Sequence, residues 1–143
     1  MNQIQEFKHK FEGSNYQKTK DMGLKQIAEL IREDLKKYAE KCRKVGFLIK
    51  FSVRTEYYSM GQSLHITLQE ANFKVYNPEF DPNEHENRKP INTEKFYKLK
   101  SVVDKIVNSY NYDNSDSMVD YFDVKFYHSF HIGERIREAE GIN

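Results

Sequence analysis

The sequence predicts an α+β fold in the order helix, strand, strand, helix, strand, with an antiparallel three-stranded sheet and the helices packed on one face. Apolar residues recur every three or four positions over about residues 21–44 and 92–110, which is typical of amphipathic helices. Apolar and polar residues alternate over 47–54 and 63–69, and again over about 121–132, which indicates strands. The length of 143 residues fits one domain.

We expect that domain to span residues 21–132, with a long loop at 77–92, because all three prolines of the chain fall in NPEFDPNEHENRKP. Residues 1–20 are expected to form an N-terminal arm or a short amphipathic helix, since Ile4, Phe7 and Phe11 have helical spacing. Residues 133–143 form a C-terminal tail, in which ERIREAEG suggests a short helix.

The two long helices each carry one apolar stripe that predicts their buried side. The stripe of the first helix, which Gly46 ends, consists of Leu24, Ile27, Ala28, Ile31, Leu35, Tyr38 and Cys42. The second helix begins after a cap at Asn92 or Thr93, and its stripe consists of Phe96, Leu99, Val103, Ile106 and Tyr110. Cys42 is therefore interpreted as a small buried hydrophobe rather than a nucleophile.

The alternation also predicts which side of each strand is buried. The inward residues of the first two strands are Phe47, Ile49, Phe51 and Val53, followed by Leu64, Ile66 and Leu68. The segment TEYYSMGQ between these strands is too long for a two-residue turn, so we expect a hairpin with an extended tip that carries Tyr57, Tyr58 and Met60. In the third strand, we expect Phe122, Val124, Phe126 and Phe130 to share one face.

The charges nearly balance, with 23 Lys and Arg against 22 Asp and Glu. This balance argues against a general nucleic-acid sponge or an acidic chaperone tail, because both need a strong field of one sign. Residues 1–50 nevertheless carry a balance of +5 and residues 51–143 a balance of −4. With one cysteine, the chain has neither an intramolecular disulfide framework nor a cysteine-built zinc site. No apolar run is long enough for a membrane span, and we expect a cytoplasmic protein with no membrane partner.

The sequence shows no catalytic constellation, so we expect a protein that is not an enzyme and needs no cofactor. The motifs GxGxxG, GxxxxGK[ST] and GxSxG are all absent. His128 and His131, with His65 as a third candidate, could suggest a metal. Residues three apart on a strand point to opposite faces, however, so we predict no metal site. An enzyme using His128 or the nearby aspartates stays as the third-ranked hypothesis.

Once the core is assigned, two surfaces remain as candidate binding sites. The first is the outer face of the first strand, with Lys50, Ser52 and Arg54, continuing into Tyr57 and Tyr58 at the hairpin. Basic groups beside aromatic rings suit phosphate contact with base stacking, but Tyr and Arg are also enriched in protein interfaces. An ordinary solvated sheet face is the remaining alternative.

The second candidate surface is the segment that carries Asp116, Met118, Asp120 and Tyr121, where apolar and aromatic side chains stand among carboxylates. The alternative for this segment is a plain solvated turn.

Three segments together resemble the large polyvalent protein-associated domains, in their small α+β type: IREDLKKYAEK, IKFSVRTEYYSMGQSLHITL and SYNYDNSDSMVDYFDVKFY. The matching positions are Ile31, Arg32, Leu35 and Lys36 in the helix, Lys50 to Arg54 in the strand, Tyr58 and Gly61 in the hairpin, and Asp116, Met118 and Asp120 in the late segment. The likeness covers roughly residues 22–127. The chain departs from the pattern in its proline-containing loop, its N-terminal arm and the tail after His131.

What the resemblance implies is a biological context. Such domains occur in phages and conjugative elements and protect the element from host defence. The leading hypothesis is therefore a non-enzymatic anti-defence protein, of the anti-CRISPR or anti-restriction type, in the bacterial cytoplasm. Its partner would be a host defence protein or a ribonucleoprotein effector. The alternative is a nucleic-acid-binding accessory domain that uses the basic and aromatic sheet face and the hairpin. The resemblance supplies no catalytic residues.

Overall fold

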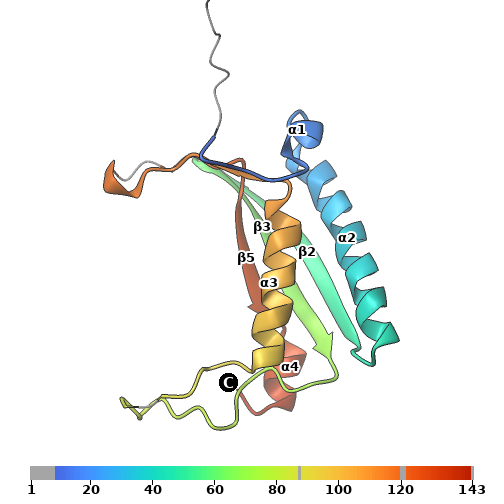
Figure 1. Cartoon of the computed structure of the whole chain (residues 1–143), viewed down its shortest axis with the longest axis vertical. Coiled ribbons are helices and arrows are strands. Elements are labelled where there is room, and N and C mark those ends of the chain that lie inside the picture. Colours follow the sequence, from blue (N-terminus) through green and yellow to red (C-terminus); the bar gives the residue numbers. More distant parts are fainter. Residues whose placement is uncertain (1–8, 87, 120–121, 143) are drawn as a thin grey trace, which may run out of the picture.

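The computed structural model describes residues 9–86, 88–119 and 122–142 of the chain, and Figure 1 shows how their elements are arranged. The order of elements along the chain is β1 (Phe11–Glu12), α1 (Tyr16–Thr19), α2 (Leu24–Lys44), β2 (Ile49–Tyr58), β3 (Gly61–Ala71), α3 (Glu94–Asn108), β4 (Tyr112–Asp113), the 3-10 turn η1 (Ser117–Val119), β5 (Tyr127–Ile132) and α4 (Glu134–Ala139). The predicted α+β class is confirmed.

The main sheet has the strand order β2-β3-β5 and is mixed, so the prediction of an antiparallel sheet is wrong in part. Strands β2 and β3 pair antiparallel, whereas β5 runs parallel to β3. The reason is the connection between them. After β3 the chain returns along the sheet through α3, so β5 starts at the end of the sheet where β3 starts (Figure 1). A helical crossover of this kind joins parallel strands.

The helices α2 and α3 pack on one face of this sheet, as the apolar stripes predict (Figure 1). The N–H of Gly23 donates to Oε1 of Gln26 at the start of α2, and Gly46 follows its end at a φ of 93°. The Thr93 hydroxyl caps α3 by accepting from the N–H of Phe96 at 3.3 Å. The core between helices and sheet is formed by Leu24, Ile27, Ala28, Ile31, Leu35, Val53, Leu64, Ile66, Leu68, Phe96, Leu99, Val103, Val107 and Phe126, among others.

The hairpin is tighter than the sequence predicts. The strands continue to Tyr58 and restart at Gly61, so Ser59 and Met60 form a two-residue turn and there is no extended tip. The segment TEYY extends β2 as far as Tyr58, because threonine and tyrosine favour strands. At the end of the two strands away from the turn, Lys50 pairs with Glu70 while Phe51 pairs with Leu68, which marks a β-bulge near the start of β2.

The last strand is shorter than the predicted 121–132, because only Tyr127–Ile132 join the sheet. Phe122 is exposed, and Val124 instead forms an isolated bridge with Asp113. The side-chain amide of Asn111 replaces sheet pairing just before β5. Its Nδ2 donates to the carbonyl of Phe126 at 3.0 Å, and its Oδ1 accepts from the N–H of Phe126 at 3.3 Å.

The described part of the N-terminal segment packs against the domain. Residues 1–8 of the predicted amphipathic helix lie outside the described residues, and Phe11–Glu12 form a strand that pairs with β4. Gly13 allows the backbones to approach closely, since a Cβ there would lie 2.1 Å from the carbonyl oxygen of Asn108. The C-terminal helix suggested by the sequence is α4.

The loop predicted at 77–92 contains no helix or strand among its described residues. Its ends are held together by a bridge between Tyr76 and Asn92. The Glu140 carboxylate, just beyond α4, accepts hydrogen bonds from the N–H groups of Val75 and Tyr76. The C-terminal residues thus fix the point where the loop leaves the core.

Candidate binding surface

The face of the main sheet opposite α2 and α3 carries most of the first predicted surface, and we call it the outer face. Side chains alternate along each strand, so the buried residues of β2, β3 and β5 identify their outward neighbours. The outer face consists of Lys50, Ser52, Arg54, Glu56 and Tyr58 from β2, Ser63, His65 and Thr67 from β3, and Tyr127, Ser129 and His131 from β5.

The structure divides the five residues predicted for the first surface. Lys50, Arg54 and Tyr58 are exposed on the outer face, and Ser52 is half-buried between them. Tyr57 is also exposed, but by alternation it points to the helix side of the sheet. The two tyrosines of the hairpin therefore lie on opposite faces of the sheet, and both are accessible next to the turn.

Tyr58 has a neighbour on the outer face that the sequence prediction did not include, namely Tyr127 of β5. A Cβ at Gly61 would lie 3.3 Å from the ring of Tyr127 and 3.4 Å from the ring of Tyr58, so the two rings flank this glycine. The Tyr58 hydroxyl lies 2.6 Å from Oγ of Ser63, which pairs with Tyr127 in the parallel register. The sequence signal for Tyr127 was its absence from any buried stripe, but only the parallel pairing places it beside Tyr58.

A chain of hydrogen bonds crosses the outer face from strand to strand. Oε2 of Glu56 lies 2.5 Å from Nε2 of His65, and Nδ1 of His65 lies 2.7 Å from Oγ of Ser129. The Ser129 hydroxyl in turn lies 2.7 Å from Nε2 of His131. This network ties together all three strands of the sheet.

Carboxylate, imidazole and hydroxyl follow one another here in the order of a serine hydrolase triad. Acyl transfer also needs hydrogen-bond donors that converge on the oxyanion. Among the described residues, the hydrogen bonds at the Ser129 hydroxyl come from the two imidazoles alone. Since Glu56 and His131 are exposed as well, we interpret the network as a surface feature that holds the strands in register.

The histidines do not combine into a metal site. His128 faces α3, where its Nε2 lies 3.0 Å from Oδ1 of Asn108, and burial lowers the pKa of its imidazole. His131 lies on the outer face, so the predicted separation of these two histidines is confirmed. No group of three or more His, Cys, Asp or Glu side chains in the described part of the chain could hold a metal ion.

The second predicted surface is partly described. Met118 and Val119 of η1 are 90% and 69% exposed, and Oδ1 of Asp116 accepts a hydrogen bond from the N–H of Met118 at 3.0 Å. Asp120 and Tyr121 lie outside the described residues. Phe122, which the sequence assigned to a strand, is 63% exposed instead and extends the apolar part of this surface.

The hairpin of the first predicted surface and the segment of the second lie toward the same end of the sheet. Figure 1 shows the β2–β3 hairpin and the segment that carries η1 at the same end. Nε2 of Gln62 donates to the carbonyl of Lys125 at 3.1 Å and joins the two segments. We call the exposed apolar residues of these segments the apolar end: Tyr57, Tyr58, Met60, Met118, Val119, Phe122 and Tyr127.

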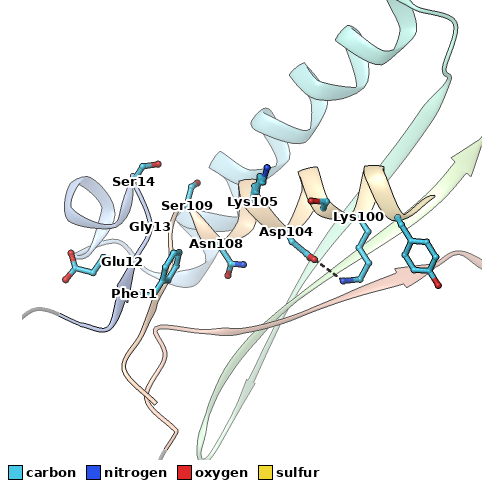
Figure 2. Close-up of a pocket in the computed structure, with 11 residues that line it drawn as sticks. Phe11, Glu12, Gly13, Ser14, Lys100, Asp104, Lys105, Asn108 and Ser109 are labelled. Carbon is cyan, nitrogen blue, oxygen red and sulfur yellow. Dashed lines mark hydrogen bonds and ion pairs between the residues drawn. The ribbon is translucent and has the colours of Figure 1, made fainter. Parts of the chain in front are cut away.

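A separate hollow lies between the N-terminal segment and α3, and Figure 2 shows the residues that line it. Its volume is about 560 Å³, and Phe11 to Ser14 form one wall. On the opposite wall, Nζ of Lys100 and Oδ2 of Asp104 form an ion pair at 2.9 Å (Figure 2). None of the residues predicted from the sequence as a binding site lines this hollow.

None of the helices in the described part of the chain is long and apolar enough to cross a membrane. Neither a family model nor a curated protein nor a solved structure matches the chain.

Proposed function

We propose that the chain is a non-enzymatic binding protein that recognises a protein partner with its apolar end. The observation that carries this proposal is the concentration of exposed apolar side chains in two segments at one end of the sheet. Met60 and Met118 are the most exposed, at 88% and 90%. Clustered exposed apolar groups of this kind mark interaction sites in folded proteins.

The side-chain types of the apolar end also favour a protein partner. Tyrosine and methionine are enriched in protein interfaces. Tyrosine buries a large area at a small loss of conformational freedom, and the flexible methionine side chain adapts to the shape of a partner. Arg54 on the outer face supplies a cation nearby, and Asp116 supplies a carboxylate in the second segment. An apolar centre with charged groups around it has the anatomy of a protein interface.

The resemblance to the large polyvalent protein-associated domains supports a specific role for this interface. We propose that the protein is an accessory factor of a phage or mobile element in a bacterial cytoplasm. In this role it binds and inhibits a host defence protein or a ribonucleoprotein effector. The proposed inhibition is stoichiometric, because a protein that acts by occupying a surface must be present in amounts comparable to its target.

The test is an affinity capture in a bacterial host that carries CRISPR and restriction systems, read by mass spectrometry. The wild-type chain should capture a defence effector and inhibit its nucleic-acid cleavage at about one copy per effector. Met60→Glu should abolish both effects. Val45→Glu is the matched control, since Val45 is 72% exposed but lies at the far end of β2 from the hairpin. Capture that Met60→Glu leaves unchanged would contradict the proposed surface.

A second candidate function is direct binding of single-stranded nucleic acid to the outer face. It is favoured by one observation, the two exposed rings of Tyr58 and Tyr127 beside Gly61, with Arg54 and Lys50 on the same face. Stacking on such rings together with phosphate contacts is a common mode of single-strand recognition.

Electrophoretic mobility shifts with a labelled single-stranded oligonucleotide test this second function. Binding should weaken steeply with salt and should be lost in Lys50→Glu and Arg54→Glu. The absence of any shift at low salt would exclude this function.

A further inference from the structure

Strand β2 is an edge strand, and part of its backbone is free to pair. Among the described strands, the order β2-β3-β5 leaves β2 with one neighbour. Nη2 of Arg32 donates to the carbonyl of Val53 at 2.8 Å, so this carbonyl points away from β3. In an antiparallel strand every second residue points its N–H and C=O to the same side, so those of Phe51 and Thr55 also point to the free edge. Among the described residues, neither Phe51 nor Thr55 has a hydrogen bond on that side.

A groove of about 480 Å³ runs along this free edge between α2 and β2. One wall is one side of α2 and is formed by Arg32, Leu35, Lys36 and Ala39. The other wall is the run Ile49–Val53. Side chains of five consecutive strand residues alternate between two faces, so a wall built from all five is the backbone edge of the strand.

The groove has a cationic rim. Nη1 of Arg32 pairs with Glu29, whereas Lys36 and Lys50 form no ion pair or hydrogen bond among the described residues. Lys50 lies opposite Glu70 in the sheet register, but the Glu70 carboxylate accepts from Nη1 of Arg135 at 3.3 Å. Two exposed ammonium groups therefore stand beside free main-chain donors and acceptors, and they would complement carboxylates.

From this geometry we propose that the groove binds an extended, acidic segment of a partner protein, which pairs with β2 as a fourth strand. Main-chain hydrogen bonds to the N–H and carbonyl of Phe51 and to the N–H of Val53, whose carbonyl already accepts from Arg32, hold the segment, as in other cases of strand addition to a sheet edge. The site is separate from the apolar end and does not depend on the function proposed for it.

The groove also indicates the side-chain pattern of its ligand. Side chains of an added strand alternate between the two faces of the sheet. Those on the helix side meet the apolar wall of Leu35 and Ala39, whereas those on the outer side lie beside Lys50. The expected ligand thus alternates apolar and acidic residues, with Lys36 at the rim as a further partner for a carboxylate.

The test uses the whole chain and an eight-residue peptide that alternates valine and glutamate, with both ends blocked. Peptide binding is followed by two-dimensional NMR, and amide exchange is measured at saturation. The N–H groups of Phe51 and Val53 should become protected. Lys36→Glu should weaken binding at least about tenfold, because a like charge then faces the carboxylates. The matched control Lys37→Glu, which removes an exposed lysine of α2 outside the groove, should leave binding unchanged.

Three results would overturn the proposal. The first is no binding at millimolar peptide, and the second is equal binding of a peptide that alternates valine and lysine. The third is a dimer in sedimentation equilibrium whose Phe51 amide is protected without peptide, because a second copy of the chain would then occupy the edge. As a steric check, Ala39→Trp should fill the groove and block the peptide while circular dichroism shows an intact fold.

Discussion

Replacing Asn111 by alanine tests whether one amide holds the segment before β5 in place. The Asn111 side chain is almost fully buried and makes three hydrogen bonds. Two of them join it to the N–H and carbonyl of Phe126, and in the third Oδ1 accepts from the N–H of Tyr112 at 3.0 Å. Asn111→Ala removes all three and leaves the buried main chain of Phe126 without these partners.

An unsatisfied buried polar group costs about 1–3 kcal/mol. Phe126 is almost fully buried, whereas Tyr112 is only half-buried, so we expect a loss of about 2–4 kcal/mol in the free energy of unfolding. Urea denaturation measures this as a lower midpoint with an unchanged slope. Asn83→Ala is the control, because Asn83 is exposed in the long loop and its side-chain amide has no hydrogen bond among the described residues. A loss below about 1 kcal/mol for Asn111→Ala would refute the reasoning.

Three further predictions concern the packing of the described elements. Gly13→Ala should destabilise the fold by about 1–3 kcal/mol in urea denaturation, because the new Cβ would overlap the backbone at the end of α3. The control Gly23→Ala should cost less than about 1 kcal/mol, because nothing lies within 4 Å of a Cβ at this position. Tyr110→Phe should cost about 1 kcal/mol and lower the thermal midpoint, because it removes the hydroxyl that donates to the half-buried carboxylate of Asp34. Burial lowers the pKa of His128 in the folded state, so the unfolded chain binds a proton at this residue more readily than the folded one. The free energy of unfolding should therefore decrease as the pH drops through the unfolded pKa of about 6.5. His128→Gln should make this decrease smaller.

The sequence was sufficient for the elements that depend on local periodicity. The stripe from Leu24 to Leu35 predicts α2 and its buried side, and the cap expected at Asn92 or Thr93 predicts the start of α3, where the structure has Thr93. The alternation in 47–54 and 63–69 predicts β2 and β3 and their inward residues from Ile49 on, although Phe47 lies before the start of β2. These features follow from which side of a helix or strand is apolar, and neighbouring residues suffice to define it.

The direction and length of the last strand could not be predicted in the same way. The alternation of Phe122, Val124 and Phe126 continues into β5 in the sequence, yet pairing with β3 begins only at Tyr127. What ends the pairing is a side chain fifteen residues away from Phe126, that of Asn111. The direction of β5 depends on the crossover through α3, which the pattern within the strand does not encode.

The candidate surfaces depend on the same long-range features. The sequence predicts Tyr58 as a binding residue, because it follows basic residues on one strand. Tyr127 is not predicted as its neighbour, because the two tyrosines come together only through the parallel register of β5. The groove at β2 could not be predicted from the sequence, because its walls come from different elements and an edge strand has the same alternation as a central one. Hydrophobic patterning locates a strand but does not state how many neighbours it has.

The groove and the apolar end lie on the same strand, which has a consequence for the kind of partner that fits. Phe51 lines the groove, and Tyr57 and Tyr58 belong to the apolar end. Tyr57 lies six positions after Phe51, and at about 3.3 Å per residue the two are about 20 Å apart along β2. A strand added at the groove and continued by seven or eight residues would therefore reach the hairpin.

A partner that uses both surfaces gains affinity from each, because the first contact raises the effective concentration of the second. Part of the net positive charge of residues 1–50 lies at the groove, since α2 and the start of β2 place Arg32, Lys36 and Lys50 there. An acidic strand would thus enter at the cationic end of β2 and terminate among its tyrosines.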